Sequence, residues 1–427
     1  MKNAREAALI ALYEIEYNNA YSNIALKNIL KAEKLDARDR AFVTTLVYGV
    51  ISKKITLDYM IEKLSKIKLK KLSKYILLIL RIGLFQIKFL DKVPDSAAVN
   101  ECVRLAKRYG HSASSGYVNG VLRNAAKADF NEISEPHIRY SFAKEVYLKL
   151  KEDYPDNIEL LLEALSKEAK TTIRANRLKI SRDELMRTIG GSICPITNDG
   201  IYVQHTDISG SKEYYDGLYT VQDASPMAVC NALNPQEGDF VIDTCAAPGG
   251  KTTYIAELMN NKGRIVAFDI YPHRVNLIKK NAERLGIDII EASVHDAQIP
   301  CEQYLFTADK VICDVPCSGI GIARRKPELK YKSDFDGLSD VQYNILKASA
   351  GYLKKGGVMI YSTCTLYKDE NERIVEKFLR ENSEFKLISM QETLPEGFFE
   401  TSEGIMTVLP NITDCDGFFA AKFERCK

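Results

Sequence analysis

The sequence predicts a multidomain protein with an all-α N-terminal bundle, a small α+β unit and a C-terminal α/β domain that has a Rossmann-like sheet. Apolar residues recur at helical spacing through residues 1–130, and no β-rich stretch interrupts them. A short strand and a helix follow within residues 171–189. From about residue 239, strands alternate with helices over about 180 residues, which is typical of a doubly wound, mostly parallel sheet. These patterns predict three domains, at 1–135, 136–215 and 216–427.

The composition argues against several classes of protein. With 427 residues, 46% of them hydrophobic and 27% charged, the chain can form several folded cores. No apolar run approaches the roughly 18 residues of a membrane span, and the N-terminus lacks the apolar stretch of an export signal. Ten cysteines occur without a C-x-x-C pair, which argues against a zinc finger or a thioredoxin-type site. We therefore expect a cytoplasmic protein with free thiols, no metal site and no membrane partner.

The charge is unevenly distributed along the chain. Residues 1–130 contain 23 lysines and arginines against 12 acidic residues, although the whole chain has a net charge of only +2. A basic half joined to an acidic half suggests a polyanion as the partner of the first. A solvated lysine-rich surface would give the same composition, so charge alone leaves both interpretations open.

The first domain reads as a series of helices, of which residues 8–15 give one clear apolar stripe. Residues 65–72 alternate apolar and basic side chains as a strand does. Because the apolar helical pattern of 75–90 follows directly, we predict one continuous helix with a basic face. Ser96 is the predicted N-cap of the next helix.

The second unit is predicted to be small and mixed. Residues 136–169 read as short helices with a break at Pro155, followed by a strand at 171–177 and a helix at 181–189. Between residues 166 and 190, seven basic residues face three acidic ones. This unit is therefore a second basic patch suited to RNA.

In the third domain the predicted strands are 240–243, 264–269, 289–294, 310–314 and 358–362, and the helices are 251–259, 273–285, 341–353 and 370–380. Ligands of such sheets bind at the carboxyl ends of the strands. The residues just after each strand are therefore the candidates for a functional site.

The loop after the first of these strands, from Asp243 to Thr252, contains small residues and two adjacent glycines. Such a loop lets the backbone approach a ligand at the N-terminus of the following helix. A P-loop would require glycine where Cys245 stands, and the G-x-G-x-x-G fingerprint fails because Gly249 and Gly250 are adjacent. The loop therefore suits a nucleoside ligand without a pyrophosphate.

Two acidic residues lie at the ends of the next strands. Asp269 ends the second strand, where a carboxylate can accept hydrogen bonds from ribose hydroxyls. Asp296 follows the third strand and can accept from an adenine amino group. Either residue alone is typical of a turn, but together with the glycine loop they indicate an adenosine-like ligand, and S-adenosylmethionine fits best.

Two cysteines follow the fourth and fifth strands. Asp314 ends the fourth strand three residues before Cys317, and Cys364 follows the fifth strand. A lone cysteine is usually a small buried hydrophobe, an interpretation that fits Cys245, Cys301 and Cys313. Two cysteines and an aspartate at one edge of the sheet instead favour a catalytic role for these residues.

Methylation of a pyrimidine at C5 needs this set of groups. A thiolate added at C6 makes C5 nucleophilic, and a carboxylic acid bonded to N3 and the exocyclic amine stabilises the developing charge. A further group near C5 assists loss of the proton and expulsion of the thiol. This chemistry needs no metal, and the strand ends alone leave open which cysteine attacks.

These motifs resemble those of the RNA 5-methylcytosine methyltransferases of the Sun/NOL/NOP group. The matching segments are Cys245–Lys251, Asp314–Gly319, Ser362–Cys364, Val221–Ser225 and Arg324–Glu328. The resemblance implies that Cys364 attacks C6, that Cys317 assists product release and that Asp314 orients the cytosine. It also implies a cofactor site formed by Cys245, Ala246, Ala247, Pro248, Gly249, Gly250, Lys251, Asp269, Asp296 and Asp314. Tyr331 stands where relatives are expected to have tryptophan.

The N-terminal domain indicates which family within this group the sequence resembles. Val93–Glu101 and Gly116–Asn124 resemble segments of the helical NusB-like domain. A NusB-like bundle, a small basic unit and a methyltransferase domain form the layout of the RsmB (Sun/Fmu) family of bacterial 16S rRNA cytosine-C5 methyltransferases. The resemblance implies S-adenosylmethionine as methyl donor, a monomer, and 16S rRNA as partner, either naked or in an early assembly intermediate.

Two other functions stay open on the sequence. One is a tRNA cytosine-C5 methyltransferase, and the other is a non-catalytic NusB-like factor for RNA binding or antitermination. A P-loop ATPase is disfavoured because Cys245 replaces the first glycine of that motif.

Overall fold

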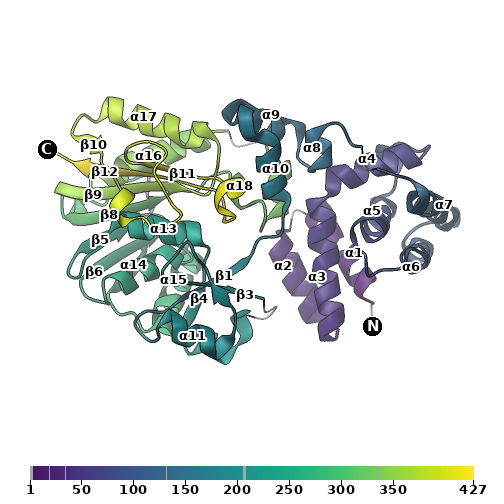
Figure 1. The fold of residues 1–427 in the computed structure, drawn as a ribbon, viewed down its shortest axis with the longest axis horizontal. Helices are drawn as coiled ribbons and strands as arrows, with labels where there is room; N and C mark the ends of the chain where they lie inside the picture. The colour runs from purple at the N-terminus through teal and green to yellow at the C-terminus, as the bar shows by residue number, and fades with distance from the viewer. Residues whose placement is uncertain (1–2, 19, 34, 131, 205–207, 334–335) are drawn as a thin grey trace. The chain divides into compact units, whose positions relative to one another are not determined.

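The computed structural model describes residues 3–18, 20–33, 35–130, 132–204, 208–333 and 336–427. The chain forms two compact units, Met1–Glu152 with Lys326–Ser333, and Asp153–Arg325 with Asp334–Lys427. The first unit is helical, whereas the second contains a small mixed domain and a large sheet with helices (Figure 1). The predicted fold class is therefore confirmed. Within the described ranges, no helix has both the length and the apolar character needed to cross a bilayer.

The helices of the first unit pack around one hydrophobic core, to which Leu46, Leu80 and Leu122 contribute fully buried side chains. Asp36 and Ser73 begin two of the helices, because their side chains accept hydrogen bonds from the amides of the first turn. The helices are α1 (Ala4–Tyr17), α2 (Ser22–Ala32), α3 (Ala37–Ser52), α4 (Lys54–Leu64), α5 (Lys74–Phe89), α6 (Asp95–Tyr109), α7 (Ser114–Lys127), α8 (Pro136–Arg139) and α9 (Lys144–Asp153), the last of which ends at the boundary of the unit.

Two predicted features of this unit are wrong. The expected continuous helix through 65–90 is interrupted, since α4 ends at Leu64 and α5 begins at Lys74, with only the 3-10 turn η1 (Leu69–Lys71) between them. Ser73 starts a new helix by accepting the Ile76 amide, which separates the alternating segment from the apolar helix. Ser96 is not an N-cap, because α6 starts one residue earlier, after Pro94.

A segment from far along the chain belongs to this helical unit. Residues Lys326–Ser333 contain the 3-10 helix η6 (Pro327–Tyr331). The buried Lys330 Nζ donates to two backbone carbonyl oxygens of the unit at 3.0 and 2.6 Å. The Tyr331 hydroxyl donates to the carbonyl oxygen of Ile51 at 2.6 Å. The residue that replaces the expected tryptophan is therefore held in the helical core by packing and a hydrogen bond.

The small domain combines helices with an antiparallel sheet of strand order β2-β3-β1-β4. The strand predicted at 171–177 and the helix predicted at 181–189 are confirmed as β1 and α11, and Ser181 caps α11. Strands β2 to β4 were not predicted, because two to four residues carry too little alternation to be recognised. The elements are α10 (Ile158–Ser166), β1 (Thr171–Ala175), α11 (Arg182–Ile189), β2 (Ser192–Ile193), β3 (Gly200–Val203), α12 (Lys212–Tyr215) and β4 (Tyr219–Val221).

The large sheet has eight strands, of which seven follow the order β10-β12-β9-β8-β5-β6-β7 while β11 pairs with β12. Strands β5 to β9 are parallel to one another, as predicted, whereas β10, β11 and β12 add an antiparallel part that was not predicted. The strands are β5 (Phe240–Asp243), β6 (Arg264–Asp269), β7 (Ile290–Val294), β8 (Ala308–Asp314), β9 (Leu353–Thr363), β10 (Phe385–Leu387), β11 (Ile405–Val408) and β12 (Phe418–Arg425).

Helices cover both faces of this sheet (Figure 1). Val241 and Ile242, adjacent in β5, belong to two different hydrophobic clusters, because successive strand residues point to opposite faces. The cluster around Val241 contains residues of three helices, and the cluster around Ile242 contains residues of two others. These helices are, respectively, α13 (Ala224–Leu233), α14 (Gly250–Leu258) and α15 (Pro272–Leu285), and α16 (Leu338–Ala350) and α17 (Glu372–Glu381).

The strand order places a switch point between β5 and β8. From β5 the chain continues to β6 on one side, whereas β8 lies on the other side and is reached only after β7. The loops after β5 and β8 therefore diverge and leave a crevice at the carboxyl edge of the sheet. Ligands of open α/β sheets bind in this crevice.

Candidate active site

The loop from β5 to α14 is fixed by backbone hydrogen bonds. The Ala246 amide donates to the carbonyl oxygen of Phe268 at 2.8 Å, and the Gly249 amide donates to that of Ala246 at 2.7 Å. Gly249 has a φ of 101°, which glycine adopts readily, and no side chain caps α14. The first-turn amides of α14 have no acceptor within the helix, so this end can bind an anionic or polar ligand group.

A cavity of about 290 Å³ opens beside this loop. It lies at the switch point, since residues after β5 form one side and Asp314 at the end of β8 forms another. Strands β1 and β4 of the small domain contribute a third side through Thr172 and Val221. The lining residues from the predicted cofactor loop are Cys245, Ala246, Ala247, Pro248, Gly250 and Lys251.

Lys251 and Asp314 form an ion pair across the crevice. The Lys251 Nζ lies 2.7 Å from Asp314 Oδ2, and the Ser362 hydroxyl of β9 donates to Asp314 Oδ1 at 2.7 Å. Burial alone would lower the pKa of Lys251, but the Asp314 carboxylate more than offsets this and raises it. Lys251 is therefore a cation that stabilises the charged form of Asp314.

The two predicted catalytic cysteines are in contact. Their Sγ atoms lie 3.2 Å apart, and the Cys364 amide donates to Cys317 Sγ at 3.3 Å. Both side chains are half-buried free thiols. The contact with Cys364, together with burial, raises the pKa of the Cys317 thiol well above its usual value. Cys317 is therefore a protonated thiol near neutral pH.

Glu370 connects the two cysteine loops and was missed by the sequence analysis. Its buried carboxylate accepts hydrogen bonds from the Ser318 amide at 2.9 Å and from the Gln342 side chain at 2.8 Å, both at Oε2. The Thr365 hydroxyl donates to Oε1 at 3.4 Å. Ser318 directly follows Cys317, and Thr365 directly follows Cys364. No sequence motif marks this acid, because its function depends on loops 52 and 5 residues away.

Asp269 and Asp296 lie further along the carboxyl edge, at the ends of β6 and β7, and they do not line the cavity. Asp269 Oδ1 accepts the Tyr271 amide at 3.1 Å, and Asp296 Oδ1 accepts the Gln298 amide at 3.0 Å. Each carboxylate thus stabilises its own turn with one oxygen. This geometry agrees both with a turn residue and with an adenosine-binding acid.

Arg325 forms a second charged cluster at the cavity, with Asp223 and Asp416. Asp223 also caps α13 through the Ser225 amide. Burial and the nearby Asp223 raise the pKa of Asp416 to about 6. Asp223 and Arg325 therefore bring together, at this cavity, the two segments that resemble family motifs, Val221–Ser225 and Arg324–Glu328. The third member of the cluster, Asp416, was not predicted.

Comparison with protein families matches all three parts of the chain. A model described as 16S rRNA methyltransferase RsmB/F matches residues 230–424. The NusB family matches residues 2–127, and an RsmF/B-like ferredoxin-like domain matches residues 146–203. The N-terminal and C-terminal resemblances found in the sequence are thereby confirmed.

Relatives also span the chain. It is 35% identical to the probable ribosomal RNA small subunit methyltransferase B of Bacillus subtilis over 99% of both chains, and 34% identical to the Synechocystis protein of the same name over 100% of both. The crystal structure of PH0851 matches with a TM-score of 0.82 and 26% identity, covering 99% of this chain and 98% of that chain. With family motifs, fold and full-length similarity in agreement, the chain belongs to the RsmB/F family of 16S rRNA methyltransferases.

Proposed function

We propose that this protein transfers the methyl group of S-adenosylmethionine to C5 of a cytosine in 16S rRNA through a covalent adduct between Cys364 and C6. The observation that carries the proposal is the contact of the two thiols, 3.2 Å apart, next to an ion-paired aspartate at the switch point. A cysteine with only a packing role would not need a second thiol and a carboxylate at the same edge. Membership of the RsmB/F family supports 16S rRNA as the substrate.

S-adenosylmethionine, the methyl donor of this family, supplies an electrophilic methyl group when bound. The loop Cys245–Lys251 would hold it at the α14 N-terminus, where the first-turn amides can donate hydrogen bonds to a ligand. Asp269 would accept the ribose hydroxyls, and Asp296 would accept the adenine amino group. Both acids lie along the same edge as the loop, in the strand order β5, β6, β7.

Residues at the ends of β8 and β9 would then carry out the methyl transfer. The Cys364 thiolate adds to C6 and raises the electron density at C5, which attacks the methyl group. Asp314, which is paired with Lys251, accepts from the exocyclic amine, and Lys251 supplies the N–H for N3 that a carboxylate lacks. These contacts stabilise the charge that the addition places on the pyrimidine ring.

Cys317 assists the last step. Water takes up the C5 proton, the electron pair of that C–H bond re-forms the C5–C6 double bond, and Cys364 leaves C6 as a thiolate. The Cys317 thiol, whose raised pKa keeps it protonated, donates a hydrogen bond to that departing sulfur. This assignment agrees with the family resemblance, in which the cysteine of the Pro-Cys motif promotes release.

RNA binding is assigned to the basic helical unit and the small domain. Lys63, Lys66, Lys68, Lys70, Lys71 and Lys74 are all exposed in and around the connection between α4 and α5. Such a run suits the phosphate backbone. The target base itself must be single-stranded or extruded before the thiol can reach C6.

The test is transfer of a labelled methyl group to naked 16S rRNA, with total tRNA in parallel and Cys364→Ala as the control, followed by bisulfite mapping. One protected cytosine in 16S rRNA, absent with the variant, is the expected result. Label in tRNA alone would move the activity to the alternative tRNA substrate. No label in naked RNA or in partly assembled small subunits would favour an RNA-binding factor and contradict the proposal.

A further inference from the structure

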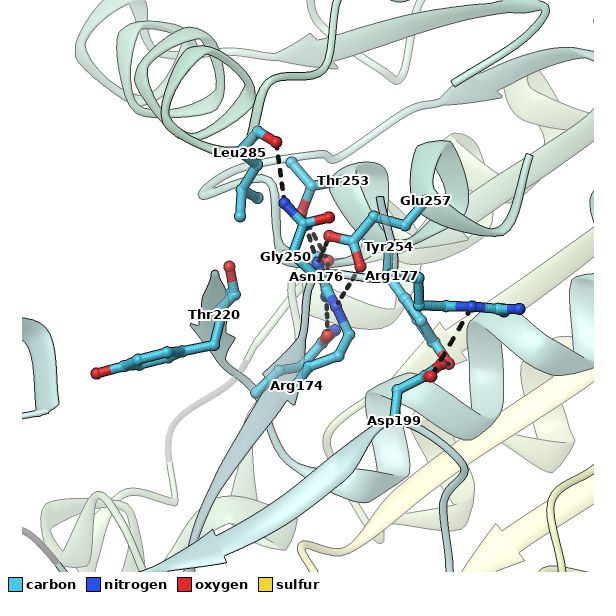
Figure 2. Close-up of polar contacts among 12 residues, drawn as sticks. Arg174, Asn176, Arg177, Asp199, Thr220, Gly250, Thr253, Tyr254, Glu257 and Leu285 are labelled. Carbon is cyan, nitrogen blue, oxygen red and sulfur yellow. Dashed lines mark hydrogen bonds and ion pairs between the residues drawn. The ribbon is translucent and has the colours of Figure 1, made fainter. Parts of the chain in front are cut away.

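A fully buried ion pair joins the small domain to the helix that begins at the cofactor loop. Arg174 comes from β1 and Glu257 from α14, and both side chains are 0% exposed. Arg174 Nη2 lies 2.6 Å from Glu257 Oε1, and Nε donates to Oε2 at 3.2 Å. Figure 2 shows Arg174 on its strand with dashed lines from the guanidinium to the Glu257 carboxylate.

The remaining donors of Arg174 hold residues of the cavity wall. Nη1 donates to the carbonyl oxygen of Gly250 at 2.9 Å and also to the Gln222 side chain. Nη2 donates to the Thr253 hydroxyl at 3.2 Å. Gly250 and Gln222 both line the cavity assigned to the cofactor. The Arg174 guanidinium therefore connects Gly250, in the first turn of α14, to the side chain of Gln222.

A second contact from the small domain holds the same helix. The Tyr254 hydroxyl of α14 donates to Asp199 Oδ2 at 2.7 Å, and the Arg174 guanidinium lies 4.6 Å from the centre of the Tyr254 ring (Figure 2). Thr172, two residues before Arg174 in β1, lines the cavity directly. The small domain thus forms part of the cavity wall, in addition to its proposed role in RNA binding.

Packing alone does not explain the pair. Burying two charges is costly, and apolar side chains of similar volume often stabilise a protein equally well or better. What apolar residues cannot supply is the set of N–H donors that fixes the Gly250 carbonyl and the Gln222 amide. A planar guanidinium with five donors suits this geometry, and a lysine does not reproduce it.

We propose that Arg174 is a positioning residue for S-adenosylmethionine, so that the small domain sets the affinity of the methyltransferase domain for its cofactor. The inference rests on the proposed function in one respect, namely that this cavity holds S-adenosylmethionine. Arg174 acts through Gly250 and Gln222 and does not itself touch the reacting atoms.

The decisive variant is the double replacement Arg174→Met with Glu257→Met in the full-length chain. It removes both buried charges together, so we expect a Tm close to that of the unaltered protein. We expect the calorimetric Kd for S-adenosylmethionine to rise at least tenfold, while kcat at saturating cofactor changes less than threefold. The matched control is Arg177→Met on the same domain, because the Arg177 side chain is 45% exposed and lies 3.8 Å from Asp199, and the replacement leaves the Arg177 backbone in place. Its Kd should stay within twofold.

A double variant that keeps both its Tm and its Kd would overturn the proposal and leave the pair a structural element. If the double variant does not fold, the variant Arg174→Lys is used instead, because it keeps the positive charge that neutralises Glu257. An unchanged Kd of Arg174→Lys for S-adenosylmethionine would also overturn the proposal. Failure of the unaltered protein to bind S-adenosylmethionine would instead reject the proposed function.

Discussion

The thiols of Cys317 and Cys364 are close enough that each shapes the chemistry of the other. Contact with Cys364, together with burial, raises the pKa of the Cys317 thiol. In the proposed mechanism, Cys364 is the nucleophile and Cys317 is the hydrogen-bond donor that aids its release. The two single replacements should therefore behave differently.

Cys317→Ala should trap the enzyme on its substrate, because methylation proceeds but expulsion of Cys364 is slowed. We expect a protein–RNA adduct that survives a denaturing gel when labelled 16S rRNA and S-adenosylmethionine are present. Cys364→Ala should form no adduct and lose at least about 10³-fold in kcat. An adduct formed by Cys364→Ala would reverse the two assignments.

Asp243 should make stability depend on pH. Burial raises its pKa to about 7, whereas an unfolded aspartate titrates near 4. Between these values the folded state binds a proton that the unfolded state does not, so this residue lowers stability as the pH rises from about 4 to about 7. Asp243→Asn removes the effect, which amounts to about 1.4 kcal/mol per pKa unit.

The measurement is urea unfolding of the unaltered protein and Asp243→Asn at pH 5 and pH 8. Relative to the unaltered protein, the variant should be more stable at pH 8 than at pH 5. Asparagine retains an oxygen to accept from the Thr252 hydroxyl, which donates to the carboxylate at 2.6 Å. A constant difference between the two proteins at both pH values would mean that Asp243 titrates normally.

At the scale of elements, the catalytic edge is held together by loops that belong to different strands. Helices α16 and α17 pack on the face of the sheet that carries the Ile242 cluster. Glu370, just before α17, binds the loop after β8 and the loop after β9 at once. The distance between the two thiols therefore depends on a residue that touches neither.

Glu370→Gln should loosen the connection between the two loops, because a neutral amide oxygen accepts the Ser318 and Gln342 hydrogen bonds more weakly than a carboxylate, and the amide nitrogen cannot accept from the Thr365 hydroxyl. We expect a loss of roughly 1–3 kcal/mol in unfolding free energy. We also expect a lower single-turnover methylation rate with an unchanged Kd for S-adenosylmethionine. Glu376→Gln, an exposed position on α17, is the control and should change neither quantity. An unaltered methylation rate in Glu370→Gln would exclude a positioning role.

Most large elements of the chain were predictable, and their ends were not. Long amphipathic segments such as α15 and the parallel strands carry repeated local signals. The interruption between α4 and α5 was missed because apolar and basic residues alternate there without burial. The antiparallel strands β10 to β12 were missed because their pairing joins segments that only the folded sheet brings together.

On the scale of the whole molecule, the basic N-terminal sequence gives an exposed run of lysines. Replacing Lys66, Lys68, Lys70 and Lys71 with glutamine should weaken binding to a 16S rRNA fragment, since each phosphate contact releases a counterion. The slope of log K against log[salt] should fall by up to about 0.7–0.9 per lost contact. Equilibrium binding between low and high KCl measures this slope.

Lys279→Gln with Lys280→Gln, exposed on α15, provides the control with the same chemistry at another place. If the lysine run is only a solvated surface, the quadruple variant and the control will give the same slope as the unaltered protein. That outcome would leave the proposed methylation intact and remove only the assignment of this surface to RNA.

The sequence by itself determined the order of the three parts, the cofactor loop, the acids at the strand ends and the two cysteines. These features are local, because a period of 2 or 3.6 residues and a motif of a few residues can be read without the fold. The carboxyl ends of parallel strands then meet at one edge by topology alone. Only the tertiary structure decided that Arg174 binds Glu257 across 83 residues, that Glu370 binds Ser318 across 52, and that Lys330 and Tyr331 return to the helical unit. A buried polar side chain takes whichever partners the fold brings to it, and those partners leave no periodic trace in the sequence.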